Sequence, residues 1–331
     1  MNGLSHGGDL QAFASRNPDA PRPSIDLSTG INPVPYPATL DMQAMARLPG
    51  RADYDSCVAA FAAYAEADRD LVRVIPGSQS AISVLPTLFK KCHVAILAPT
   101  YGEHELCWRQ AGHKVTRATA SQIVDMDADI IVLTNPNNPD GHVFGCDALR
   151  ALQKRQAHKN GWLVVDEAFV DAAPGQSVAK HVSDGGLIVL RSFGKFFGLA
   201  GLRLGFLIAP ASIGKRYGDL LGPWSVATPA LVIGAQAYAD GSWIAETRQR
   251  LMSDVVQLRD LMAERVEGMV VGTALFQLFT TPNAQHLASH LADHGIFVRC
   301  FTDQPDWLRM GLPGNDLEWH RLQNALESWE K

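Results

Sequence analysis

A series of short apolar runs constrains the fold of this chain more than any other feature. Each run is almost continuous in apolar side chains, and segments with helical character separate one run from the next. Such strands are typical of a sheet that helices cover on both faces, and a sheet of this kind is largely parallel. The sequence therefore predicts an α/β fold with a mainly parallel sheet between helices. The runs are 93–98, 129–134, 161–166, 186–191 and 203–209.

Helices are expected between these strands and again in the last third of the chain. In the first part they are 55–66, 78–90, 103–112 and 147–158, with a bend expected at Pro86. After residue 211 a long helix, 242–267, precedes apolar stretches and further helices, a pattern that indicates a smaller α+β domain. Three parts are predicted: an N-terminal arm at 1–50 that contributes to the small domain, a large domain at 51–211, and the connecting helix with a small C-terminal domain at 212–331.

Composition excludes several classes of protein. The chain has 331 residues, 47% of them hydrophobic and 19% charged, with a net charge of -5 and no basic run for nucleic acid. No apolar stretch approaches the roughly 20 residues of a membrane helix, so a cytoplasmic protein is expected. The five cysteines are widely spaced, and the histidines show no metal-binding spacing. Neither a disulfide framework nor a metal site is predicted.

One lysine, Lys195, lies in an almost uncharged and glycine-rich stretch, 192–205. Desolvation and a nearby cation, Arg203, both lower the pKa of a lysine and so favour attack on a carbonyl group. Ser192 and Arg203 can each hydrogen-bond an anion, and the glycines allow a bulky ligand to come close. A reactive amine beside an anion site suits pyridoxal 5'-phosphate (PLP). The alternative is a solvated lysine in a glycine-rich loop.

Other residues at strand ends match the remaining needs of a PLP site. Asp166 ends an apolar strand and could pair with the pyridine nitrogen, while Asn138 lies in a segment that contains two Asn-Pro pairs and could bind the ring oxygen. Tyr101 could stack on the ring or lie at the edge of the core. Gly77, Ser78 and Gln79 follow an apolar run and open a helix, where backbone N–H groups favour a phosphate, although Gly-Ser also caps helices. Taken together, these residues predict a PLP site beyond the strand ends.

The chain resembles the fold-type I PLP-dependent enzymes, the aspartate aminotransferase superfamily, over nearly its whole length. The resemblance rests on the order and spacing of the motifs SFGK…GLRLG, NPNNPDG and DEAF, which begin at Ser192, Asn135 and Asp166. Within that superfamily the chain is most similar to the threonine-phosphate decarboxylases of cobalamin biosynthesis, followed by histidinol-phosphate aminotransferases. The narrower resemblance also uses the segments 6–8, 26–33 and 223–226.

The resemblance implies a role for each matching residue. Lys195 would form the Schiff base with PLP, Asp166 would pair with the pyridine nitrogen, Asn138 with the ring hydroxyl, and Tyr101 would stack on the ring. Tyr54 would reach the cofactor phosphate of a neighbouring subunit, which implies a homodimer with shared active sites. Arg309 would bind the substrate carboxylate. The implied phosphate contacts are Ser78, Gln79, Ser192 and Arg203, and the residues that would help to enclose the substrate are His6, Asn32 and Arg299.

The activity implied is decarboxylation of a phosphorylated amino acid, L-threonine O-3-phosphate. The product would be (R)-1-amino-2-propanol O-2-phosphate. A second hypothesis is an aminotransferase that acts on a phosphorylated substrate such as histidinol phosphate. A third is a non-catalytic partner in a biosynthetic complex. The chain departs from the family pattern at Pro313, where a second arginine after Arg309 is expected. This departure removes one candidate anion contact.

Overall fold

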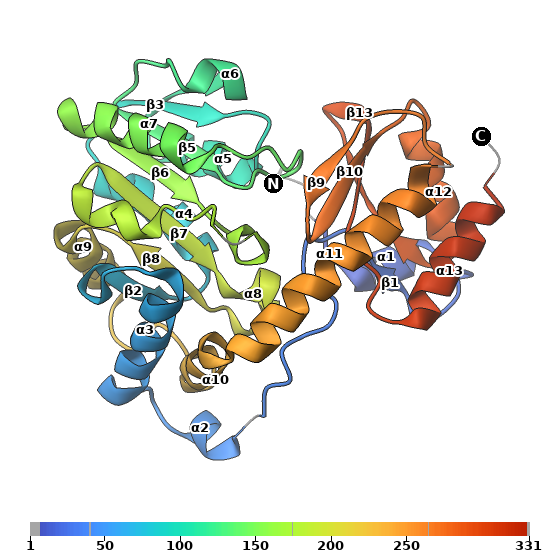
Figure 1. Cartoon of the computed structure of the whole chain (residues 1–331), viewed down its shortest axis with the longest axis horizontal. Coiled ribbons are helices and arrows are strands. Elements are labelled where there is room, and N and C mark those ends of the chain that lie inside the picture. The colour runs from blue at the N-terminus through green and yellow to red at the C-terminus, as the bar shows by residue number, and fades with distance from the viewer. Residues whose placement is uncertain (1–6, 40, 174, 264, 330–331) are drawn as a thin grey trace. The chain divides into compact units, whose positions relative to one another are not determined.

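The computed structural model describes residues 7–39, 41–173, 175–263 and 265–329 (Figure 1). Its contacts divide the chain into two compact units. The large unit comprises Tyr36–Asn138 and His142–Ala245. The small unit comprises the described residues of Met1–Pro35, Pro139–Gly141 and Glu246–Lys331. The expected boundaries lie near residues 50 and 211, whereas the compact units divide after residues 35 and 245. The functional division into arm, cofactor domain and small domain stays a prediction.

A mixed sheet forms the centre of the large unit. In the described part of the chain it has seven strands, and all of them run parallel except β8, which is antiparallel to both of its neighbours. The expected α/β fold with a mainly parallel sheet is confirmed. The strands in spatial order are β2 (Val72–Ile75), β8 (Gly205–Ile208), β7 (Leu187–Ser192), β6 (Trp162–Asp166), β5 (Ile130–Thr134), β3 (His93–Leu97) and β4 (Lys114–Ala118).

Helices pack around this sheet (Figure 1). The expected bend at Pro86 is a change of helix type, because α4 ends at Val84 and a 3-10 turn continues over Leu85–Leu88. No helix in the described ranges is long and apolar enough to cross a membrane. The α-helices of the large unit are α2 (Met42–Ala46), α3 (Arg51–Ala65), α4 (Ser78–Val84), α5 (Gly102–Gln110), α6 (Ala120–Ile123), α7 (Cys146–His158), α8 (Phe193–Phe196), α9 (Ala211–Leu221) and α10 (Thr228–Ala239).

The central strands are buried because their apolar side chains have helices on both sides. Ile131, Val132 and Leu133 of β5 are fully buried, as are the apolar residues of β7. Each side chain of this size stabilises the fold by about 1.5–3 kcal/mol when it leaves water. On α3, Phe61 stacks on Phe206 of β8 with ring centroids 3.8 Å apart. This packing fixes the strand ends that carry the polar residues.

The small unit combines the two ends of the chain. Its main sheet has the order β12 (Arg299–Phe301), β13 (Gln304–Met310), β10 (Phe276–Thr280) and β9 (Val270–Thr273), all antiparallel. The N-terminal segment adds β1 (Ile25–Asp26), which pairs in parallel with β11 (Ile296–Phe297), so blue and orange segments lie side by side in Figure 1. The helices are α1 (Leu10–Arg16), α12 (Ala284–Asp293), α13 (Asp316–Glu327) and, from residue 246, α11 (Gly241–Ala263).

Candidate active site

The carboxyl ends of parallel strands carry most of the residues predicted to bind the cofactor. Gly77 follows β2, Tyr101 follows β3, Asn138 follows β5, and Asp166 is the last residue of β6. Ser192 ends β7, and β8, which runs in the opposite direction, starts at the same edge of the sheet just after Arg203. In α/β sheets this edge is where ligands bind. The large unit therefore brings the predicted cofactor residues to one edge.

Asp166 is buried and held by a histidine that sequence reasoning missed. Nε2 of His104 donates to Oδ2 of Asp166 at 3.0 Å, and both side chains are less than 5% exposed. The backbone N–H of Ala168 donates to the other carboxylate oxygen at 3.1 Å. His104 lies on α5, three residues after Tyr101, so both face the same side of the helix start. That spacing is the signal that could have identified it.

Lys195 lies on the short helix α8 directly after β7 and is half-buried. Its Nζ is 5.7 Å from the centre of the Phe169 ring. The three phenylalanines around it, Phe193, Phe196 and Phe197, are fully buried. A four-residue helix is not stable by itself, so these rings fix the position of Lys195.

A close contact between two strand ends forms the predicted phosphate site. Gly77 has a φ of 76°, and a Cβ atom there would lie 2.8 Å from Nη2 of Arg203. At Gly205 a Cβ atom would lie 2.7 Å from the backbone nitrogen of Ser78. Larger residues at either position would therefore displace the guanidinium group or the start of α4. Both glycines keep Arg203 and the N–H groups of α4 together.

Tyr101 and Gln79 connect the starts of α5 and α4. The hydroxyl of Tyr101 donates to Oε1 of Gln79 at 3.1 Å, and Nε2 of Gln79 lies 3.5 Å from Glu103. Burial, and then the charges of Glu103 and Asp166, raise the pKa of Tyr101 to about 12. The phenol is therefore a neutral hydrogen-bond donor at physiological pH. This bond holds the tyrosine ring beside the strand ends.

Two other asparagines hold the loop that carries Asn138. Oδ1 of Asn135 accepts from the backbone N–H of Phe144 at 2.8 Å, which closes the loop. Asn137 accepts from Thr100 at 2.7 Å and donates to the Pro99 carbonyl at 2.9 Å. These bonds connect the end of β5 to the end of β3. Asn138 is thus carried on a loop with little freedom to move.

A buried charge network next to Asp166 was also missed. Arg191 of β7 contacts both Glu167 and Asp171, and all three side chains are at most 2% exposed. Burial lowers the pKa of Arg191, but the two carboxylates outweigh burial and raise it. For Glu167, burial raises the pKa, because it disfavours the charged carboxylate. Partners 20 or more residues apart give no local sequence signal, so only the fold reveals the network.

Two predicted substrate residues face each other in the small unit. Arg299 of β12 pairs with Arg309 of β13 in the antiparallel register. Nη2 of Arg309 donates to the Ser28 carbonyl at 2.6 Å. Burial, followed by the charge of Arg299, lowers the pKa of Arg309. Burial lowers the pKa of Arg299 as well, so an anion bound beside the two arginines would favour their charged forms.

Of the other predicted residues, Asn32 is 1% exposed in the small unit and accepts from Nη2 of Arg250 at 2.6 Å. Tyr54 lies on α3 of the large unit and is half-buried. His6 lies outside the described residues. The residues predicted to bind the cofactor thus lie in the large unit, and Asn32, Arg299 and Arg309 lie in the small unit.

The large unit fits PLP in the chemistry of its groups. It supplies the amine of Lys195 and the buried carboxylate of Asp166, which His104 holds. It also supplies the guanidinium group of Arg203, close to the N–H groups at the start of α4. Among the described residues, no group of three His, Cys, Asp or Glu side chains could hold a metal ion.

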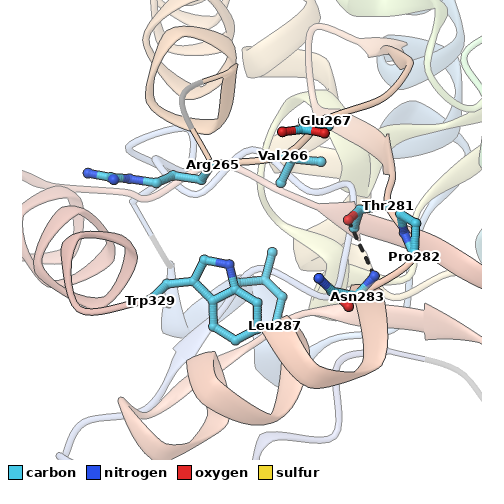
Figure 2. Close-up of a pocket in the computed structure, with 8 residues that line it drawn as sticks. All are labelled: Arg265, Val266, Glu267, Thr281, Pro282, Asn283, Leu287 and Trp329. Carbon is cyan, nitrogen blue, oxygen red and sulfur yellow. Dashed lines mark hydrogen bonds between the residues drawn. The ribbon is translucent and has the colours of Figure 1, made fainter. Parts of the chain in front are cut away.

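A cavity of about 280 Å³ in the small unit contains none of the predicted site residues (Figure 2). Its lining is Arg265, Val266, Glu267, Thr281, Pro282, Asn283, Leu287 and Trp329.

The chain matches a known protein family over most of its length. The family described as aminotransferase class I and II matches residues 34–326. A threonine-phosphate decarboxylase from Pseudomonas aeruginosa is 41% identical over 328 residues, which cover 98% of this chain and 97% of the relative. A second threonine-phosphate decarboxylase, from Sinorhizobium sp., is 39% identical, with 99% and 98% covered.

Solved structures show the same fold at lower identity. The crystal structure of a histidinol-phosphate aminotransferase from Clostridium acetobutylicum is similar with a TM-score of 0.81 at 19% identity. The match covers 92% of this chain and 98% of the solved one. At this identity the similarity concerns the fold alone.

Proposed function

This chain belongs to the aminotransferase class I and II family, and from that premise we propose that it is a PLP-dependent threonine-phosphate decarboxylase of cobalamin biosynthesis. The observation that carries the proposal is the similarity to two threonine-phosphate decarboxylases at 41% and 39% identity over almost the whole of each chain. The reaction cleaves the bond between the α-carbon and the carboxylate of L-threonine O-3-phosphate. A proton replaces the carboxylate, and the products are carbon dioxide and (R)-1-amino-2-propanol O-2-phosphate.

The large unit would hold PLP through the residues at its strand ends. Lys195 would supply the amine for the Schiff base, and Asp166, held by His104, would keep the pyridine nitrogen protonated. Tyr101 would stack on the ring, and Asn138 would donate to the ring oxygen. When bound, PLP accepts the electron pair that remains on the α-carbon as carbon dioxide leaves. The phosphate contacts in this proposal are Gly77, Ser78, Gln79, Ser192 and Arg203.

The small unit would recognise the two anionic groups of the substrate. Arg309 would bind the carboxylate, and Arg299 with His6 would contact the substrate phosphate. The register pairing of the two arginines supports this assignment, because anionic groups of a substrate would stabilise the charges of two neighbouring cations that burial disfavours. Lys195 would return the proton to the α-carbon.

A direct test is incubation of the PLP-loaded protein with L-threonine O-3-phosphate in the absence of any oxo acid. We expect release of carbon dioxide and formation of the amino alcohol phosphate. Amino transfer that requires 2-oxoglutarate, with no gas released, would contradict the decarboxylase and favour the aminotransferase. Protein without a cofactor absorbance that borohydride shifts would favour a non-catalytic role.

The variant Lys195→Ala tests the role of the amine. We expect the borohydride-fixable cofactor absorbance to disappear and the release of carbon dioxide to fall by about a thousandfold or more, because the covalent attachment is lost. The matched control is Lys215→Ala, since Lys215 is 74% exposed on α9 and pairs only with Asp219 among the contacts described. A Lys195→Ala protein that keeps both properties would overturn the assignment.

A further inference from the structure

A buried tyrosine on α9, Tyr217, is connected to the turn at Gly77 through the hydroxyl group of Ser80. The hydroxyl oxygens of Tyr217 and Ser80 lie 2.8 Å apart, and Tyr217 is 1% exposed. Oγ of Ser80 also lies 2.7 Å from the carbonyl oxygen of Gly77. The same carbonyl oxygen accepts from the backbone N–H of Ser80 at 3.1 Å. Two donors from one residue therefore hold the carbonyl group of Gly77.

The direction of these hydrogen bonds follows from the groups involved. A carbonyl oxygen can only accept, so Ser80 donates its single hydroxyl proton to Gly77. Tyr217 must then donate its own proton to Oγ of Ser80. Burial raises the pKa of Tyr217 to about 12, so the phenol keeps this proton at physiological pH. The bonds therefore run in one direction, from Tyr217 through Ser80 to Gly77.

The conformation of Gly77 determines where the backbone N–H of Ser78 points. Gly77 has a φ of 76°, and a glycine can adopt many other conformations at similar energy, so the turn needs support. In the planar trans peptide between Gly77 and Ser78, the C=O and N–H bonds point in opposite directions. Because Ser80 holds the carbonyl group, the N–H of Ser78 points to the other side of the peptide. Arg203 lies beside this turn, since a Cβ atom on Gly77 would be 2.8 Å from its Nη2.

We propose that Ser80 and Tyr217 are positioning residues that direct the N–H of Ser78 toward the phosphate group of PLP. The proposal rests on the proposed function, in which Gly77, Ser78 and Arg203 contact this phosphate. Neither hydroxyl group touches the cofactor; Ser80 fixes the peptide, and Tyr217 fixes Ser80. The turn has no assigned role toward the ring or the amine. Binding of PLP therefore depends on the two hydroxyl groups, whereas binding of pyridoxal, which lacks the phosphate, does not.

The test measures the Kd of the cofactor-free protein for PLP and for pyridoxal, from the absorbance of each bound aldehyde. The Kd for PLP should rise about tenfold in Ser80→Ala and about threefold in Tyr217→Phe, as expected on loss of neutral hydrogen bonds. The Kd for pyridoxal should stay unchanged in both variants. The matched control is Tyr238→Phe, which removes a buried hydroxyl group that has no hydrogen-bond partner among the described residues. Ser80→Thr keeps the hydroxyl group and should recover most of the affinity for PLP.

A double-substitution cycle tests whether Tyr217 acts through Ser80. When Tyr217→Phe is added to Ser80→Ala, the Kd for PLP should rise no further. Multiplicative losses would overturn this order of action. An unchanged Kd for PLP in Ser80→Ala, or an equal loss of affinity for PLP and for pyridoxal, would overturn the positioning role itself.

This comparison is independent of the activity of the protein. If the wild-type protein binds PLP but releases no carbon dioxide from L-threonine O-3-phosphate, the decarboxylase assignment fails. The comparison of PLP with pyridoxal then still decides the roles of Ser80 and Tyr217. If the wild-type protein binds PLP no more tightly than pyridoxal, it gains nothing from the phosphate, and the positioning proposal is overturned.

Discussion

His104 is the residue whose role is clearest from a single contact. It donates to a carboxylate oxygen of Asp166 inside the fold, and both side chains are less than 5% exposed. A hydrogen bond of this kind fixes the carboxylate and stabilises its charge. In the proposed site, this hydrogen bond would keep Asp166 ionised and aligned with the pyridine nitrogen of PLP. The histidine is therefore expected to affect the electronic state of the cofactor more than its binding.

The variant His104→Phe tests this expectation. It keeps a ring of similar size in α5 and removes the donor to Asp166. We expect decarboxylation to slow by about tenfold, because one hydrogen bond to a charged group is lost, while PLP stays attached to Lys195. The pH dependence of the cofactor absorbance should shift, a change that a merely structural role would not produce. The control is His104→Gln, which retains an N–H donor and should recover part of the rate.

Asp53 controls the start of the helix that carries Tyr54. Its two carboxylate oxygens accept from Arg47 at 2.6 and 2.7 Å, and the backbone N–H of Gly50 donates to one of them at 2.7 Å. The hydrogen bond from Arg47 lowers the pKa of Asp53 to about 2. A carboxylate whose pKa is lower in the folded state stabilises the fold above its unfolded pKa.

The variant Asp53→Asn should therefore destabilise the protein in a pH-dependent way. At pH 7 we expect a loss of about 1 kcal/mol in the free energy of unfolding, from the first-turn carboxylate and its capping bond. As the pH falls from about 4 toward 2, Asp53 becomes protonated in the parent protein, so the difference should shrink. Denaturant unfolding of both proteins at several pH values measures this difference in the free energy of unfolding. A difference that stays constant over this range would contradict the assignment.

At the scale of elements, an aromatic cluster holds the short helix α8. Trp243 stacks on Phe197 with ring centroids 5.5 Å apart and meets Phe196 edge-on at 5.7 Å. Tyr36 contacts Trp243 at 5.2 Å, and its backbone N–H donates to the Phe197 carbonyl at 2.9 Å. Tyr36 and Trp243 lie close to residues 35 and 245, after which the chain passes from one unit to the other.

Replacement of Trp243 by leucine should weaken the hold on Lys195. The variant loses three ring contacts and part of a half-buried surface, so we expect the free energy of unfolding to fall by about 2 kcal/mol. Because α8 would then be less fixed, the Kd for PLP should rise as well. Thermal unfolding and a PLP titration measure the two effects. Trp243→Phe keeps the stacked face and should behave much like the parent, and an equal loss in both variants would contradict this explanation.

The elements differ in how well the sequence predicts them. The strands β3, β5, β6 and β7 were predicted because both of their faces are buried, which makes them continuous apolar runs. The edge strand β4 was missed, because only two of its five residues are buried and it includes the exposed residues Lys114 and Arg117. The chain's own motifs predict a set of cofactor residues, and their assignment to PLP stays a prediction. The partners of those residues, such as His104 for Asp166, depend on tertiary contacts that no local pattern records.

At the scale of the whole molecule, we propose a homodimer in which each subunit completes the site of the other. In this arrangement Tyr54 of one subunit contacts the cofactor phosphate held by the second. Exposed apolar side chains near the start of α3 support a face that another protein surface covers: Met42, Met45 and Leu48 are 69%, 55% and 63% exposed. A dimer of this type has two equal sites, each with residues from both chains.

Complementation between two inactive variants tests the shared site. Tyr54→Phe removes the phosphate contact, and Lys195→Ala removes the amine, so each homodimer should be impaired in both of its sites. In a mixed dimer one site carries both changes and the other carries neither. Random exchange of subunits should therefore restore about a quarter of the parental sites, because half of the dimers are mixed and each has one intact site. Carbon dioxide release after mixing should rise to that level, with unmixed variants as controls. If Tyr54 acts within its own subunit, every site in every dimer contains one of the two changes, and mixing should restore no activity.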